Sequence, residues 1–138
     1  MIFIFELVPF NIEVRLSLFM NKYKLVIENN TKINHVYWAN NPWLRLRGLL
    51  GRDKLTTEIG LLISPCNSVH TIGMKYSLDI IYLDKDDKVI KIRANLEPWD
   101  FSICKGACKV LELLVGNYKS KNIKYGDELI FVDHKYDS

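Results

Sequence analysis

Residues 78–94 read LDIIYLDKDDKVIKIRA. The run 78–83 is apolar except for Asp79, and the run 88–94 is rich in β-branched side chains. Both compositions are typical of β-strands. The charged residues 84–87 between the two runs have the composition of a turn. Two strands joined by such a turn predict a β-hairpin, and the rest of the chain can be arranged around it.

Further short strands are expected on both sides of this hairpin, each bounded by turn residues such as Asn29-Asn30 or Gly126-Asp127. They fall in the runs 22–28, 33–39, 60–63 and 109–115, and at the close of the chain in 123–132. Residues 41–52 and 116–122 are expected to form helices. The fold class predicted is mainly β (α+β), a compact barrel or sandwich of about seven short strands with two small helices.

The first helix has recognisable ends. Asn41 can cap it, Pro42 suits its first position, and Gly51 suits a left-handed exit. Its apolar residues recur at helical spacing, which places Arg45 and Arg52 near the flanks of the buried face. The helix and the inward sides of the strands predict a hydrophobic core made of Trp43, Leu46, Leu50, Leu62, Ile80, Leu83, Val89, Leu111, Leu113, Leu129 and Phe131.

Length and composition indicate one globular domain. A chain of 138 residues should bury roughly two-thirds of the surface that its unfolded form exposes, enough for one core. Hydrophobic residues make up 49% and charged residues 25%, which disfavours both disorder and a membrane class. The net charge is +3, but the basic residues are scattered among 16 acidic ones, so nucleic-acid binding is not expected. Three cysteines, an odd number, fit a reducing compartment, and we expect a cytoplasmic location.

The domain is expected to span residues 20–133, followed by a short tail at 134–138. Residues 1–5 are apolar, but no basic residue precedes them, and Glu6 and Arg15 are among the polar residues that interrupt the run. The segment is therefore neither a good signal peptide nor a membrane span. Residues 1–19 are interpreted as an extension or as a mis-called start, because Met20 directly precedes an alternating strand.

The approach to the strand at 78–83 concentrates side-chain chemistry. Cys66 and His70 are four residues apart, as are Cys104 and Cys108, so a Cys3His zinc site is conceivable by count. Structural zinc pairs favour two intervening residues, however, and thiols are among the most buried groups in proteins. We therefore expect buried, inert thiols, no cofactor, and a wide separation between the first pair and the second.

A nucleophilic site is the other chemical interpretation of this segment. Cys66 would be the thiolate, His70 its base and Asp79 the orienting acid. No oxyanion-hole motif accompanies these residues, and a packed imidazole for His70 is the simpler interpretation. A catalytic role for Cys66 and His70 is accordingly less favoured than a structural one.

Asp79 lies inside an apolar strand, where an unpaired carboxylate costs several kcal/mol. We expect it to accept hydrogen bonds from Arg45 or Arg52, or from backbone amides of residues 68–73. Such an ion pair would clamp the helix to the hairpin; the same arginine could instead meet an anionic ligand in a polar pocket. Glu112, which also lies in an apolar run, invites the same argument.

Five ordered segments resemble domain-of-unknown-function family 192, a set of small bacterial and archaeal proteins. They are the Arg-x-Arg-Gly-Leu-x-Gly-Arg run at 45–52, the Cys-x-Ser-Val-His-Thr-x-Gly-Met run at 66–74, and the segments 78–84, 110–113 and 123–127. The resemblance covers about 110 residues. Residues 114–116 read Leu-Val-Gly, where the family pattern has Pro-Ala-Gly. Members with an aromatic residue in place of the cysteine and histidine segment keep the same fold, which also disfavours zinc.

The function favoured by the sequence is a binding or accessory module for a small ligand or a protein partner, in a polar groove near residues 66–79. Its expected residues are Arg45, Arg52, Cys66, His70, Thr71, Met74 and Asp79. A thiol-dependent hydrolase using Cys66 and His70 and a zinc-stabilised interaction domain are the alternatives.

Overall fold

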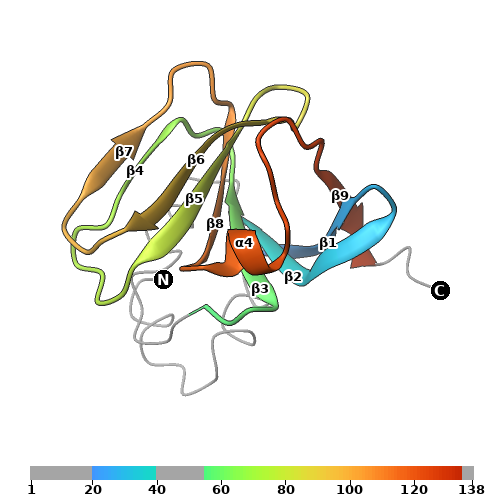
Figure 1. The fold of residues 1–138 in the computed structure, drawn as a ribbon, viewed down its shortest axis with the longest axis horizontal. Helices are drawn as coiled ribbons and strands as arrows, with labels where there is room; N and C mark the ends of the chain where they lie inside the picture. The colour runs from blue at the N-terminus through green and yellow to red at the C-terminus, as the bar shows by residue number, and fades with distance from the viewer. Residues whose placement is uncertain (1–19, 40–54, 135–138) are drawn as a thin grey trace.

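The computed structural model describes residues 20–39 and 55–134. Seven strands form one sheet in the order β6-β5-β8-β3-β2-β1-β9. These are β1 (Asn21–Ile27), β2 (Asn30–Ala39), β3 (Ile59–Ile63), β5 (Leu78–Leu83), β6 (Val89–Leu96), β8 (Lys109–Leu114) and β9 (Ile130–Asp133). Only the pair β2–β3 is parallel; the other pairs of this sheet are antiparallel. In Figure 1, β9 lies at the opposite side of the molecule from a separate ribbon of two strands, β4 (Ser68–His70) and β7 (Phe101–Ile103).

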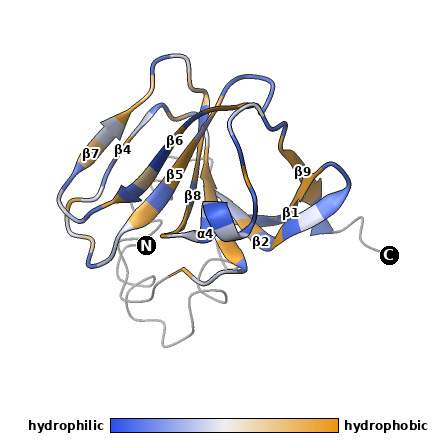
Figure 2. Cartoon of the chain, in the orientation of Figure 1, coloured by the Kyte–Doolittle hydropathy of each residue, from blue (hydrophilic) through white to orange (hydrophobic). Residues whose placement is uncertain are grey.

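Both faces of the large sheet are covered by apolar side chains. Every residue of β5 is buried, and its alternate residues enter two different cores. Ile80 and Tyr82 lie in the first core, which the β4–β7 ribbon covers through Val69, whereas Ile81 and Leu83 lie in the second. Figure 2 shows the resulting pattern, with apolar residues along β3 and β9 and a hydrophilic α4 (Asn117–Ser120) on the surface.

The sheet does not close into a barrel, so the barrel alternative of the predicted barrel or sandwich was wrong. The start of β6 and the turn before it meet the segment that precedes β9 at a single corner. The bonds there are Val89 N–H to Asp127 O, Gly126 N–H to Val89 O and Leu129 N–H to Asp87 O, each 2.9 Å long. Beyond the isolated bridge between Lys88 and Glu128, β9 pairs with β1 and β6 with β5. The sheet is therefore an open, curled one, joined at this corner.

The hairpin prediction is confirmed by the antiparallel pairing of β5 with β6, in which Ile81 lies opposite Ile92. The mainly β class is confirmed as well. Residues 20–39 and 55–134 contain nine strands instead of about seven, because β4 and β7 are three-residue strands that give no periodic signal. Of the two expected helices, α4 falls within 116–122, and the helix at 41–52 lies outside the described residues, together with Trp43, Leu46 and Leu50.

The predicted core is confirmed for its described members. Leu62, Ile80, Leu83, Val89, Leu111, Leu113 and Leu129 are all buried, and Phe131 packs half-buried against the second core. Among residues 20–39 and 55–134, no helix has the length and apolar character needed to cross a membrane.

Candidate functional site

Asp79 is buried and partnered, as expected, and its donors among the described residues are two backbone amides that were not predicted. One carboxylate oxygen, Oδ1, accepts a hydrogen bond from the Asn95 amide at 2.9 Å, and Oδ2 accepts one from the Gly116 amide at 2.7 Å. Both donors have left-handed backbones, with φ of 51° and 86°. Asp79 thus ties an irregularity of the β5–β6 pairing to the residue that caps α4. The prediction of amides from residues 68–73 was wrong, and Arg45 and Arg52 lie outside the described residues.

Thr71 and Met74 are both buried, and both hold structure together. The Thr71 hydroxyl donates to the Glu97 carbonyl and accepts the Asp100 amide, and its backbone exchanges further bonds with Trp99 and Asp100. Met74 packs in the first core. Thr71 thus fastens the loop before β7 to the end of β4, and Met74 contributes to the core.

Cys66 precedes β4 and His70 is the last residue of that strand, and their side chains have different hydrogen-bond partners. The Cys66 thiol donates to the Ser68 carbonyl at 3.1 Å, while Nδ1 of the exposed His70 accepts the Ile72 amide at 3.3 Å. The Asp79 carboxylate is directed to Asn95 and Gly116. A Cys66–His70–Asp79 triad is therefore not assembled in this structure.

Backbone hydrogen bonds join the segments that carry the three cysteines. Cys66 donates its amide to the Cys108 carbonyl at 3.0 Å, and Cys104 donates its amide to the Asn67 carbonyl at 2.9 Å. The segments that carry the cysteines are thus adjacent, but these backbone contacts do not contradict the prediction that the four candidate ligand atoms lie beyond the reach of one zinc ion. His70 lies at the far end of β4, and in the described parts of the chain no group of three or more His, Cys, Asp or Glu side chains could hold a metal ion.

Glu112 lies in the middle of the large sheet, on β8 between Leu61 of β3 and Ile80 of β5. Its neighbours Val110 and Ile80 belong to the first core, and none of the described residues donates a hydrogen bond to its carboxylate. Burial raises the pKa of Glu112 to about 7. The same argument predicted a hydrogen-bonded carboxylate for Glu112, and the described residues supply no donor to it.

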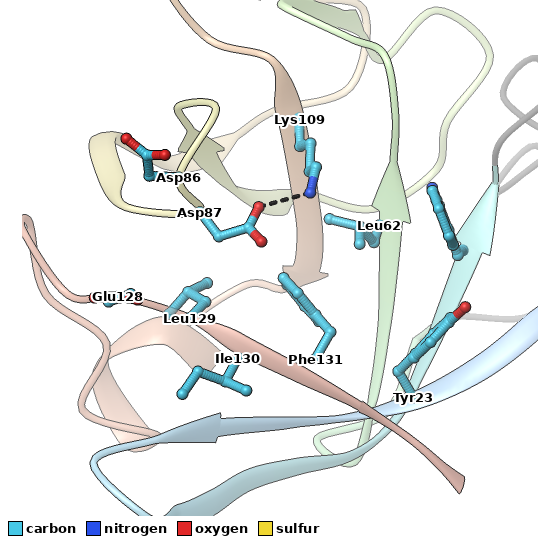
Figure 3. A pocket seen from close by; sticks show the side chains of 10 residues that line it. Tyr23, Leu62, Asp86, Asp87, Lys109, Glu128, Leu129, Ile130 and Phe131 are labelled. Carbon is cyan, nitrogen blue, oxygen red and sulfur yellow. Dashed lines mark hydrogen bonds and ion pairs between the residues drawn. The ribbon is translucent and has the colours of Figure 1, made fainter. Parts of the chain in front are cut away.

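A pocket of about 390 Å³ lies on the other side of the molecule, beneath the corner where the sheet edges meet (Figure 3). Its walls are apolar and largely aromatic: Tyr23 of β1, Trp38 of β2, Leu62 of β3, Leu129, and Phe131 of β9. The rings of Tyr23 and Trp38 meet edge to face, with centroids 5.9 Å apart. Such a volume and lining are typical of small-molecule sites.

Charged side chains surround this apolar interior. Asp86, Asp87, Glu128 and Lys109 line the pocket, and Figure 3 shows Lys109 of β8 meeting Asp87 of the β5–β6 turn. The Lys109 ammonium lies 2.7 Å from Asp87 Oδ1. With Asp87 paired in this way, the carboxylates of Asp86 and Glu128 are left as an excess of negative charge.

The turn that carries Asp86 and Asp87 is rigidly organised. Asp84 Oδ1 accepts the amides of Asp86 and Lys88 at 2.8 and 3.0 Å, and these backbone bonds, chiefly that of Lys88, hold the pKa of Asp84 below its usual value. Asp87 has a φ of 61°, a conformation that Asp tolerates better than most residues. The backbone that carries Asp86 and Asp87 is consequently held in place beside the pocket.

Sequence reasoning missed this pocket. Its lining comes from residues 23 to 131 across five strands and two connecting segments, and no local motif joins them. The acids at 86 and 87 have the composition of an ordinary solvated turn, and Tyr23 and Trp38 that of ordinary strand aromatics.

Comparison with known proteins identifies the family. Residues 24–131 match the model of DUF192, which is described as an uncharacterized ACR. The chain belongs to DUF192. The resemblance inferred from the five sequence segments is thus confirmed. A UPF0127 protein of Thermococcus sibiricus is 35% identical over 97 residues, which are 66% of this chain and 62% of that protein.

Two crystal structures share the fold of this DUF192 protein. A protein of unknown function from Novosphingobium aromaticivorans has a TM-score of 0.68 at 24% identity, covering 79% of this chain and 83% of its own. A protein of Sinorhizobium meliloti, named as a candidate transcription regulator, has a TM-score of 0.70 at 22% identity, covering 80% of this chain and 92% of its own. At these identities the likeness shows the fold alone.

Proposed function

We propose that this DUF192 protein is a binding module for a small organic cation with an aromatic or apolar body. The observation that carries the proposal is the 390 Å³ pocket, whose aromatic walls lie beneath an excess of carboxylates. Binding at Cys66, His70, Thr71, Met74 and Asp79 stays a prediction. The side chains of Thr71 and Asp79 are engaged in hydrogen bonds within the fold, and Met74 packs in the first core.

The walls favour an apolar body with a positive charge. Tyr23, Trp38 and Phe131 offer aromatic faces within one pocket, and a cation over such a face gains about 0.5–2 kcal/mol, more when desolvated. Asp86 and Glu128 are both exposed, so their attraction for the cation is modest and falls as salt rises. The apolar floor is expected to supply most of the affinity.

Benzyltrimethylammonium is a suitable first probe, with toluenesulfonate as its anionic match. We expect the cation to bind with a Kd of about 1 mM, a value reasonable for so small a ligand, and to shift the amide resonances of Leu129 and Phe131 in an NMR titration. The sulfonate should bind more weakly. Equal binding of the two probes would overturn the charge preference, and shifts confined to other regions would overturn the pocket.

Two variants and one control separate the aromatic and the charge contributions to binding. Phe131→Leu keeps an apolar side chain but removes one aromatic face, and should weaken cation binding by about fivefold. Tyr125→Leu is the control, because Tyr125 is 75% exposed and does not line the pocket. The double variant Asp86→Asn with Glu128→Gln should bind the cation more weakly and the sulfonate at least as tightly. Its cation binding should also depend less on salt concentration.

A further inference from the structure

Four large apolar side chains are exposed on or beside the β4–β7 ribbon, where the polar residues described above are used within the fold. Trp99 is 73% exposed, Phe101 56%, Ile72 52% and Ile103 46%. Most of the large apolar side chains that are exposed in the described parts of the chain gather here. Apolar groups exposed together in one place mark interaction surfaces. We call these four side chains the ribbon patch.

The alternation of β7 places half of this patch on the outer face of the ribbon. Ser102 is buried, and its hydroxyl accepts a hydrogen bond of 2.8 Å from Tyr82 of the large sheet. Successive side chains of a strand point to opposite faces, so Phe101 and Ile103 point away from the large sheet. Figure 1 shows the ribbon at the outer margin of the molecule. The outer face of β7 is therefore open to a partner.

Trp99 and Ile72 extend the patch beyond one end of the ribbon. The Trp99 amide donates to the Thr71 carbonyl at 3.0 Å, and the Met74 amide donates to the same carbonyl. Trp99 thus lies beside the turn that carries Ile72. Its φ is 62°, a conformation in which a bulky side chain is an outlier. Backbone outliers of this kind cluster at functional sites. Here the fold accepts a strained backbone at a residue whose indole ring is left in water.

Lysines flank the patch at both of its ends. Lys75 directly follows the turn beside Trp99, and Lys105 follows β7 at the other end. Both are exposed, and among the described residues no ion pair includes either of them. The Lys91 ammonium is held at the edge of β7, where it donates to the Ile103 carbonyl at 2.8 Å.

Two acidic residues lie near these lysines, and one of them is neutralised. The Asp100 carboxylate accepts the Phe101 amide at 2.7 Å and forms an ion pair of 3.3 Å with Arg93. Glu97 is exposed and opposes the lysines. Three lysines against the Glu97 carboxylate leave an excess of positive charge around the patch, which is complementary to an anionic surface.

We infer that the ribbon patch docks on a bilayer that contains anionic lipids, with its apolar side chains in the headgroup region. Tryptophan is favoured at the interface between membrane and water, and lysines near the surface are attracted by anionic headgroups. A bilayer offers negative charge on every side of an inserted side chain, which suits lysines at both ends of the patch. Docking of this kind uses neither the corner pocket nor its ligand.

The test measures sedimentation of the full-length protein with vesicles of phosphatidylcholine alone or mixed with phosphatidylglycerol. We expect binding about tenfold tighter to the mixed vesicles, and weaker as salt rises. Brominated lipids in the mixed vesicles should quench the fluorescence of Trp99. Because the chain has three tryptophans, this quenching is read as the difference between the natural chain and Trp99→Phe, which keeps an apolar ring.

Two pairs of matched variants separate the apolar and the charge contributions. Trp99→Asn with Phe101→Ser should weaken binding to mixed vesicles at least tenfold, since Asn tolerates the left-handed backbone. Its control is Tyr125→Ser with Val115→Ser, two exposed apolar residues outside the patch, which should bind as the natural chain does. Lys75→Gln with Lys105→Gln should also weaken this binding. Lys119→Gln with Lys124→Gln removes the same charge elsewhere on the exposed surface and should weaken it less.

Three results would overturn the inference. The first is no binding to either kind of vesicle. The second is an equal loss in both lysine variants, which would show unspecific attraction of a basic protein. The third is self-association without lipid that the Trp99 and Phe101 variant abolishes, because the patch would then be occupied by a second copy of the chain. Circular dichroism establishes that every variant is folded before vesicles are added.

Discussion

The β4–β7 side of the molecule and the corner between β6 and β9 use their polar residues in different ways. On the β4–β7 side, the polar side chains of Thr71 and Asp79 form hydrogen bonds within the fold. Thr71 fastens the loop before β7, and Asp79 accepts hydrogen bonds from two backbone amides. At the corner, Asp86 and Glu128 surround an apolar pocket. A dense motif can therefore be structural, while ordinary turn and strand residues form the more open site.

The largest expected effect tests whether Asp79 is a structural clamp. Asp79→Ala leaves the amides of Asn95 and Gly116, whose hydrogen bonds to Asp79 are partly buried, without their acceptor. An unpaired donor costs about 1–3 kcal/mol where it is buried. We expect the free energy of unfolding in urea to fall by about 3–5 kcal/mol. The control, Asp79→Asn, keeps one acceptor oxygen and should lose roughly half as much. A loss under about 1 kcal/mol for the alanine variant would break the contrast between the two regions, because Asp79 would then be available for binding.

Much of the fold could be predicted, because strand periodicity and turn composition are local signals. The β5–β6 hairpin and most of the core follow from them. The β4–β7 ribbon could not be predicted, because a strand of three residues shows no periodicity. Its pairing also depends on contacts between distant residues such as 68 and 103. That the sheet stays open could not be predicted either, because pairing between β6 and β9 depends on the curl of the whole sheet.

The candidate site was less predictable than the fold, for a related reason. Burial of Asp79 follows from its apolar neighbours, but its donors lie 16 and 37 residues further along the chain. The pocket walls come from strands at both ends of the sequence, so no spacing rule connects Tyr23 with Phe131. Long-range packing, which a single sequence does not display, decides both.

The second prediction concerns Glu112, which lies between the two regions. Its folded pKa is about 7, against 4.5 for the unconstrained group. Between these values the folded state keeps a proton that the unfolded state has lost, so stability falls as pH rises. The contribution is fully present below pH 4.5, is lost through pH 7, and is worth about 3 kcal/mol.

Glu112→Gln isolates this contribution, because the amide has nearly the same shape and does not titrate. The difference in unfolding free energy between the natural chain and the variant should change by about 3 kcal/mol from pH 4.5 to about pH 8, with the variant relatively more stable at the higher pH. Other titrating groups, such as Asp84 and Glu58, cancel in this difference. A constant difference across the range would mean that the carboxyl stays ionised when folded.

The smallest expected effect concerns Thr71 and sharpens the contrast between the regions. Thr71→Val keeps the shape of the side chain but removes the hydroxyl that accepts the Asp100 amide at 2.9 Å and donates to Glu97. The amide is partly buried, so we expect a loss of about 1–2 kcal/mol in unfolding free energy, with Thr71→Ser close to the natural chain. Hydrogen exchange should quicken at Asp100 and Phe101, whereas binding of benzyltrimethylammonium at the corner pocket should stay the same. A parallel loss of cation binding would show that the two regions are coupled, and the division of structural and binding roles between them would fail.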